Sequence, residues 1–191
     1  MCLDQSALNG KPFLGKYKYL RSLGKGSMGT VFLAKDTSSG KKYAIKATST
    51  DKRGQREKEY LMKAREVSGI PILYDWKEEN GVLFLVMEYI DGYEIDDRIT
   101  LKNAGYDLKE IAAKLAENYI KQIVDDGFFH ADPHPGNLRI RDGKIVWIDF
   151  GMMGILNRAD KDLMRDAVLA IGQNDTQKLV DVILTLGEHD G

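Results

Sequence analysis

Hydrophobic and polar positions divide the first half of the chain into five short strands and one helix. The strands are predicted where apolar and polar side chains alternate, or where β-branched and aromatic residues cluster, at residues 17–23, 30–34, 43–46, 72–76 and 82–88. In residues 53–67 the apolar positions recur three and four apart, which predicts a helix with one buried face. Asn80-Gly81 favours a tight hairpin between the last two strands.

The second half is predicted to be mainly helical. Asp107-Leu108-Lys109-Glu110 has the pattern of a capping box and opens a helix that Gly127 closes. Asn157 and Asp175 begin two further helices. The side chains expected to be buried on these two helices are Leu163, Ala167, Val168, Ile171, Leu179, Val182, Ile183 and Leu186.

Composition limits the class of protein. The chain has 191 residues, of which 43% are hydrophobic and 30% charged, which is enough to form the core of one domain or two small lobes. A formal net charge of -1 favours neither nucleic acid nor an anionic membrane as a partner. The longest apolar run, residues 82–87, is too short for membrane insertion. The single cysteine, Cys2, cannot form an internal disulfide, and residues 1–15 form an irregular leader without a secretory pattern. We therefore expect a cytoplasmic protein, with export as an effector left open.

A glycine-rich segment, Gly24-Lys25-Gly26-Ser27-Met28-Gly29, lies between the first two predicted strands. A dinucleotide-binding fingerprint would continue into a helix. Here β-branched and aromatic residues follow, so the glycines are interpreted as the tip of a β-hairpin whose backbone can approach phosphates. Taken alone, the motif is equally consistent with an ordinary turn.

A lysine on the third strand strengthens the phosphate interpretation. Lys46 ends the apolar segment Tyr43-Ala44-Ile45-Lys46, where it either extends to solvent or clamps a phosphate. The glycine segment upstream favours the clamp. Glu57 lies one turn before the apolar positions of the predicted helix, so it is the expected ionic partner of Lys46. The alternative is that both are solvated charges.

Three oxygen-bearing side chains follow in a spacing that suits phosphoryl transfer. The loop His130-Ala131-Asp132-Pro133-His134-Pro135-Gly136-Asn137 sets a carboxylate and an amide five residues apart, and Asp149-Phe150-Gly151 follows an apolar strand. Strands at 138–141 and 144–148, joined by Asp142-Gly143, are expected to bring Asn137 and Asp149 to the same end of a hairpin. Phosphoryl transfer needs a base and oxygen ligands for a hard divalent cation.

Parts of this pattern are also compatible with two other classes of protein. The pattern His130-x-Asp132-x-His134 could hold zinc, but the prolines within it disfavour a paired strand and a third protein ligand is missing. A nucleotide-binding module without catalysis is less favoured because Lys46, Asn137 and Asp149 are all present alongside Asp132.

Together these motifs resemble the eukaryotic-type protein kinases over residues 16 to about 151. In the loop ending at Asn137 and in Asp149-Phe150-Gly151-Met152-Met153-Gly154, the chain is most similar to the UbiB (AarF) atypical kinases. The resemblance implies an α+β, two-lobed kinase-like fold with a five-stranded antiparallel N-lobe sheet, one helix and a truncated, mainly helical C-lobe. The implied division is a leader at 1–15, an N-lobe at 16–88 and a C-lobe at 89–191, within one kinase-like domain.

The resemblance also implies roles for single residues. Asp132 would accept the proton of the attacking hydroxyl, Asn137 and Asp149 would bind Mg²⁺ (or Mn²⁺), and Lys46, fixed by Glu57, would neutralise ATP phosphates. The residues expected to contact ATP are Gly24, Gly26, Ser27, Gly29, Val31, Ala44, Lys46, Met87, Glu88 and Tyr89.

The implied activity is that of a minimal protein kinase acting on Ser or Thr. A UbiB-like ATPase or a lipid or metabolite kinase is the alternative, and a nucleotide-binding pseudokinase is the third; the oligomeric state stays open.

The sequence departs from the UbiB pattern in ways that bear on activity. It has a glycine-rich rather than an alanine-rich loop and no K-x-G-Q motif, which favours true kinase activity. No A-P-E motif follows Gly151, as expected of a minimal kinase. Ala131 replaces the arginine that often precedes the catalytic aspartate, so constitutive activity is expected. His134 either contacts the γ-phosphate or orders the loop.

Overall fold

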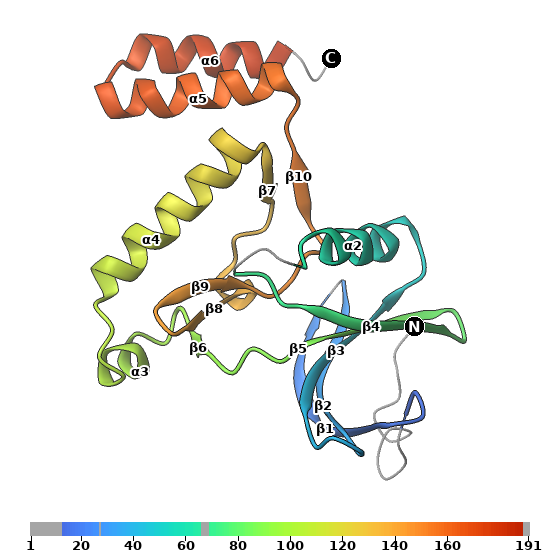
Figure 1. The fold of residues 1–191 in the computed structure, drawn as a ribbon. Coiled ribbons are helices and arrows are strands. Elements are labelled where there is room, and N and C mark those ends of the chain that lie inside the picture. The colour runs from blue at the N-terminus through green and yellow to red at the C-terminus, as the bar shows by residue number, and fades with distance from the viewer. Residues whose placement is uncertain (1–12, 27, 66–68, 189–191) are drawn as a thin grey trace. The chain divides into compact units, whose positions relative to one another are not determined.

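The computed structural model describes residues 13–26, 28–65 and 69–188 of the chain (Figure 1). The chain forms two compact units. The first unit comprises residues 1–101 and 134–151, and the second unit comprises residues 102–133 and 152–191. The predicted lobe boundary at residue 88 stays a prediction.

A five-stranded antiparallel sheet forms most of the first unit, as predicted (Figure 1). Its strands are β1 (Tyr17–Gly26), β2 (Gly29–Asp36), β3 (Lys42–Ser49), β4 (Leu73–Glu79) and β5 (Val82–Glu88), in the order β1-β2-β3-β5-β4. Asn80 and Gly81 both have positive φ, at 53° and 75°, which confirms the tight turn between β4 and β5. The third strand does not end at Lys46, as the sequence suggested, but continues to Ser49.

The alternation of side chains gives the sheet two different faces. On one face an apolar cluster forms the core, with Tyr17, Phe32, Ala34, Ile45, Ala47, Phe84 and Val86 as its buried members. Lys46 lies between Ile45 and Ala47 and therefore points to the opposite face. Its cross-strand neighbours are Val31 on β2 and Leu85 on β5.

Helix α2 (Lys52–Lys63) follows β3 after a turn of two residues. Asp51 caps it by accepting hydrogen bonds from the main-chain N–H groups of Arg53 and Gly54, at 2.9 and 3.2 Å. A β carbon at Gly54 would lie 2.1 Å from the carbonyl oxygen of Ser49, the last residue of β3. The first turn of α2 therefore needs glycine at this position. The predicted helix was too long, because α2 ends at Lys63, and residue 67 lies outside the described residues.

A smaller sheet completes the first unit. Its strands are β6 (Tyr93–Glu94), β8 (Leu138–Arg141) and β9 (Lys144–Trp147), in the order β6-β8-β9. The hairpin turn has positive φ at Asp142 and Gly143, 54° and 71°, as the sequence predicted. The short 3₁₀ turn η2 (Pro135–Asn137) leads into β8, and α3 (Arg98–Asn103) crosses the boundary between the units in sequence.

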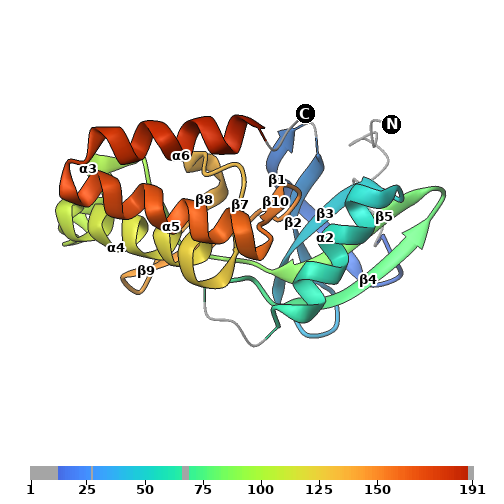
Figure 2. The ribbon, with the colours of Figure 1, turned by 90° about the horizontal axis from the view of Figure 1, so that it is seen from above.

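The second unit is mainly helical. Its elements are α4 (Leu108–Lys121), the π-helical turn η1 (Gln122–Asp126), β7 (Phe128–His130), β10 (Met153–Ile155), α5 (Arg158–Gln173) and α6 (Thr176–Glu188). Strands β7 and β10 pair antiparallel, and α5 and α6 lie side by side as a helical hairpin (Figures 1 and 2). The predicted caps are confirmed, since Asp107, Asn157 and Asp175 accept hydrogen bonds from Lys109, Asp160 and Lys178.

The predicted burial on α5 and α6 was partly wrong. Val182 is buried as expected, whereas Val168, Ile171 and Ile183 are 37%, 62% and 59% exposed. Ala170, which was not among the expected residues, is buried. The apolar stripe is wider than the surface over which each helix packs, so part of it faces outward. Within the described ranges, no helix has both the length and the apolar character needed to cross a bilayer.

Candidate active site

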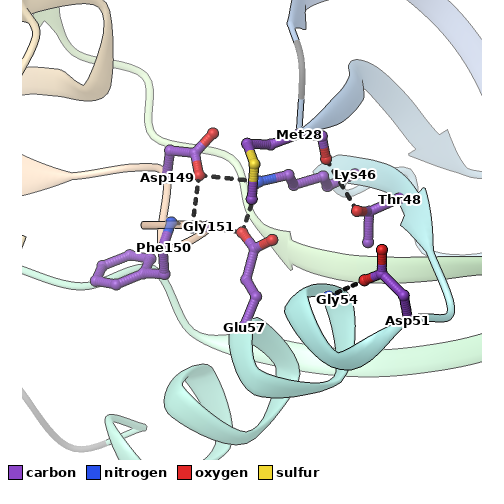
Figure 3. Close-up of polar contacts among 9 residues, drawn as sticks. All are labelled: Met28, Lys46, Thr48, Asp51, Gly54, Glu57, Asp149, Phe150 and Gly151. Atoms are coloured by element: carbon purple, nitrogen blue, oxygen red, sulfur yellow. Dashed lines mark hydrogen bonds and ion pairs between the residues drawn. The ribbon is translucent and has the colours of Figure 1, made fainter. Parts of the chain in front are cut away.

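Lys46 is the centre of a buried ionic cluster in the first unit. Its ammonium nitrogen lies 2.7 Å from Glu57 Oε1 and 2.9 Å from Asp149 Oδ1 (Figure 3). Only 1% of Lys46 and 1% of Glu57 is exposed. The predicted pairing of Lys46 with Glu57 is therefore confirmed, and the alternative of two solvated charges is wrong.

The charges in this cluster act on one another. Burial disfavours the ammonium of Lys46, but the carboxylates of Glu57 and Asp149 outweigh that effect and raise the pKa of Lys46. Burial raises the pKa of Glu57, and the attraction of Lys46 opposes this increase. Lys46 thus stays positively charged between two carboxylates. Its charge offsets the cost of burying the negative charge of Glu57. Glu57 Oε2 is buried and has no hydrogen-bond partner among the described residues.

The β8–β9 hairpin brings Asn137 and Asp149 to the same end, as the sequence predicted. The Ile148 N–H donates to the Asn137 carbonyl oxygen at 2.9 Å, one residue beyond the Leu138–Trp147 pair. Asp149 Oδ1 accepts from Gly151 N at 2.8 Å as well as from Lys46. A carboxylate and an amide oxygen are ligand types that suit Mg²⁺.

The glycine segment forms the tip of the β1–β2 hairpin. Gly29 has a φ of 128°, and a β carbon there would lie 2.3 Å from the Ala47 carbonyl oxygen, so the position requires glycine. The Thr48 hydroxyl donates to the Met28 carbonyl oxygen at 2.9 Å, which ties the tip to β3 (Figure 3). Ser27, one of the predicted ATP contacts, lies outside the described residues.

The Met28 side chain extends toward Asp149, Gly151 and the end of Lys46 (Figure 3). A β carbon on Gly151 would lie 2.7 Å from Met28 Cε. The tip of the glycine hairpin and the segment after Asp149 are therefore in close approach within the first unit.

Other predicted ATP contacts share the sheet face of Lys46. Val31 of β2 pairs with Lys46 of β3. Ala44 lies two residues before Lys46 on β3, so it shares the same face, and it pairs with Met87 of β5. Glu88, at the end of β5, forms an ion pair with Arg141 of β8, a contact that the sequence pattern does not predict. The Glu88 side chain is thereby engaged within the protein.

The loop before Asn137 is ordered by His134 and Arg139. His134 Nδ1 accepts from Gly136 N at 3.0 Å, and Arg139 donates to the Gly136 carbonyl oxygen at 3.2 Å. Both polar groups of that residue's backbone are thus bound. This contact favours the loop-ordering role of His134 over the γ-phosphate contact.

Asp132 lies in the second unit, whereas the other candidate catalytic residues lie in the first. The Asp132 N–H donates to Nδ1 of His130 at 3.1 Å, and His130 is 2% exposed. In the part of the chain that the structure describes, no three His, Cys, Asp or Glu side chains gather closely enough to hold a metal ion.

Comparison with known proteins gives one family match and several similar sequences. Residues 53–183 match the model of the ABC1 atypical kinase-like domain. An uncharacterized protein in the hydrogenase 1 5′ region of Clostridium pasteurianum is 48% identical over 107 residues, which are 56% of this chain and 20% of that protein.

Several of the similar sequences carry kinase names. The probable protein kinase UbiB of Tolumonas auensis is 36% identical over 124 residues, covering 62% of this chain and 22% of that protein. The chloroplastic protein ACTIVITY OF BC1 COMPLEX KINASE 8 of Arabidopsis thaliana is 34% identical over 121 residues, covering 62% and 16%. The matched stretch thus spans between 16% and 22% of the length of these relatives.

Proposed function

We propose, from the premise that this chain belongs to the family of the ABC1 atypical kinase-like domain, that it is an ATP-dependent phosphotransferase. The observation that carries the proposal is the buried Lys46, held between Glu57 and Asp149 on the face of the sheet beneath the glycine hairpin. Burying an ammonium group has a desolvation cost, and a role in binding phosphate groups would account for its presence in this position.

In the proposed complex, Lys46 neutralises the α- and β-phosphates of ATP. The backbone at Gly24, Gly26 and Gly29 covers the phosphates, because the glycines allow close approach. Val31 and Ala44 contact the base from the sheet face. The main chain of residues 87–89 hydrogen-bonds the edge of the base, while the Glu88 carboxylate stays with Arg141.

Asn137 and Asp149 are the residues that would hold Mg²⁺, or Mn²⁺ in its place. The hard oxygen donors at one end of the β8–β9 hairpin support this assignment. When bound, the cation supplies charge neutralisation on the phosphates. Lys46 and the hydrogen bond from Gly151 hold the Asp149 carboxylate in one orientation.

Asp132 is proposed as the residue that orients the acceptor. Its carboxylate accepts the proton of the attacking hydroxyl as the γ-phosphoryl group passes from ATP to that oxygen, and ADP leaves with the bridging oxygen. Positioning and charge neutralisation provide most of the rate enhancement, since the transition state is loose.

The acceptor we favour is a Ser or Thr hydroxyl of a protein. The glycine-rich hairpin, which is like that of ordinary protein kinases, supports this choice. The second candidate is an ATPase or a lipid or metabolite kinase of the UbiB type, which the similarity to the probable protein kinase UbiB over 124 residues supports. Nucleotide binding without transfer is the third.

Incubation with ATP labelled at the γ-phosphate separates these outcomes. Label on protein supports the first candidate, free phosphate or a labelled metabolite the second, and binding alone the third. Asp149→Ala should abolish turnover, and Asp132→Ala should lower it to a small residual rate, whereas Asp162→Ala, a change on the exposed side of α5, is the matched control. Full activity of Asp149→Ala would refute the metal assignment.

A further inference from the structure

The main-chain N–H and C=O of His130, which leads into the Asp132 loop, are both bound by side chains of one helical segment. The Tyr119 hydroxyl of α4 donates to the His130 carbonyl oxygen at 2.9 Å. The His130 N–H donates to Oε1 of Gln122 at 3.0 Å. Both main-chain polar groups of a single residue are therefore bound by side chains three positions apart on the same face.

A change of helix type places Gln122 for this contact. Gln122 is the first residue of the π-helical turn η1, and the Gly127 N–H, with a φ of 66°, donates to the Gln122 carbonyl oxygen. A π turn changes the direction of the side chains beyond it, and such turns are frequent at functional sites. Lys161 binds the turn from α5 by donating to the Asp125 carbonyl oxygen at 2.9 Å.

The orientation of the Gln122 amide is also fixed. Its Nε2 donates to Oδ1 of Asn118 at 2.8 Å, so the amide oxygen faces the His130 N–H. The side chains of Tyr119, Gln122 and Asn118 thus form a polar array on α4 and η1 that is directed at β7.

His130 passes this constraint on to Asp132. Its imidazole is buried, and Nδ1 accepts the hydrogen bond from the Asp132 N–H at 3.1 Å. The backbone of Asp132 is therefore oriented by the His130 side chain, and the main-chain N–H and C=O of His130 are held by Gln122 and Tyr119. All of these contacts lie within the second unit.

We propose that Tyr119 and Gln122 are positioning residues that act through His130 to orient Asp132 for phosphoryl transfer. This inference rests on the proposed function. Both residues lie in the second unit, whereas Lys46, Glu57 and Asp149 lie in the first. The hydrogen bonds of Tyr119 and Gln122 lead to Asp132, so we expect their loss to lower the rate of transfer and to leave nucleotide affinity nearly unchanged. Apolar side chains would suffice to pack β7 against the helical segment, whereas hydrogen bonds to both the N–H and the C=O of His130 also fix the orientation of its main chain.

Steady-state kinetics of three variants test the proposal. Tyr119→Phe removes one hydroxyl, and Gln122→Met removes the acceptor for the His130 N–H. Each is expected to lower kcat about fivefold, the factor that corresponds to one net hydrogen bond, with KM for ATP within about twofold. Gln122→Glu keeps an oxygen acceptor and should retain most of the wild-type kcat. Tyr74→Phe, which removes the hydroxyl of a tyrosine that is 53% exposed, is the matched control.

A double variant distinguishes positioning from general loosening of the fold. If Tyr119 acts through Asp132, Tyr119→Phe adds no further loss of kcat in an Asp132→Asn background. The inference would be overturned if Tyr119→Phe lowered kcat fivefold in both the wild-type and the Asp132→Asn backgrounds. It would also be overturned by an unchanged kcat in the single variants, or by equal losses of kcat in Gln122→Met and Gln122→Glu. Absence of ATP turnover in the wild-type chain would instead overturn the proposed function. Thermal melts of every variant identify a loss of rate that comes from unfolding.

Discussion

Replacing Lys46 by Met tests the electrostatic description of the cluster. The change keeps a long side chain in the sheet but removes the charge that faces Glu57 and Asp149. Glu57 is 1% exposed, so it cannot turn to solvent without moving α2. The variant therefore leaves the carboxylate of Glu57 buried without a positive charge beside it.

The expected loss of stability is large. Removing one partner of a buried ion pair costs about 3–5 kcal/mol, because the other charge stays buried. For a chain of this size that loss corresponds to a decrease in Tm on the order of 10 °C. Asp149 is less affected, since its side chain is 29% exposed and retains the hydrogen bond from Gly151.

The same variant should depend on pH in a defined direction. The pKa of Glu57 is already raised by burial above 4.5, and losing Lys46 raises it further. A group with a raised pKa in the folded state contributes its full stability below the unfolded pKa and loses it as the pH rises through the folded pKa. The deficit of Lys46→Met relative to wild type should therefore shrink as the pH is lowered toward the ordinary carboxyl pKa of 4.5.

A second substitution at Glu57 supplies the control. Lys46→Met with Glu57→Met replaces the ion pair by apolar groups and should recover most of the lost stability, without recovering phosphoryl transfer. Urea denaturation measures the free energy of unfolding, and labelled ATP measures turnover. A deficit below about 1 kcal/mol in Lys46→Met, or a double variant no more stable than the single one, would refute the description of the cluster.

Three further outcomes follow from single residues. The hydroxyl and N–H of Ser38 and the N–H of Ser39 bind the Asp36 carboxylate and lower its pKa from 3.8 to about 2. That contribution to stability is present above pH 3.8 and is lost as the pH falls through about 2, so melts of Asp36→Asn should show a smaller acid dependence over this window. Gly29→Ala should destabilise the chain by about 1–3 kcal/mol and raise KM for ATP, and an unaltered Tm would contradict the strain assigned there. Gly172→Ala, at an open helical position, should stabilise by about 0.5–1 kcal/mol in the same melts.

Local chemistry accounts for the parts of the fold that the sequence predicted. The turns at Asn80-Gly81 and Asp142-Gly143 follow from residues that tolerate positive φ, and the caps at Asp107 and Asn157 follow from side chains that accept main-chain hydrogen bonds. Each signal needs only a few neighbouring residues, so it can be read before the tertiary structure is known.

The errors arose where distant residues decide the outcome. The predicted third strand ends at Lys46, where the apolar segment stops, whereas the two carboxylates that allow this lysine to be buried come from α2 and from the segment after β9. Periodicity identified the apolar stripe of α5 but not which part is covered, so Ile171 was wrongly expected to be buried. The contacts of Gln122 were missed because a π turn leaves no periodic pattern in the sequence.

Two hydrogen bonds to Asp149 Oδ1 make this side chain lose its conformational entropy during folding, before any ligand binds. Its rotamer is frozen as the chain folds, by Lys46 and by the Gly151 N–H. Immobilising such a side chain costs about 0.5–1.5 kcal/mol of conformational entropy. Here that cost reduces the stability of the fold and not the free energy of ligand binding. A cation arriving at this carboxylate in the proposed role meets a preorganised ligand, so its affinity is not reduced by that ordering step.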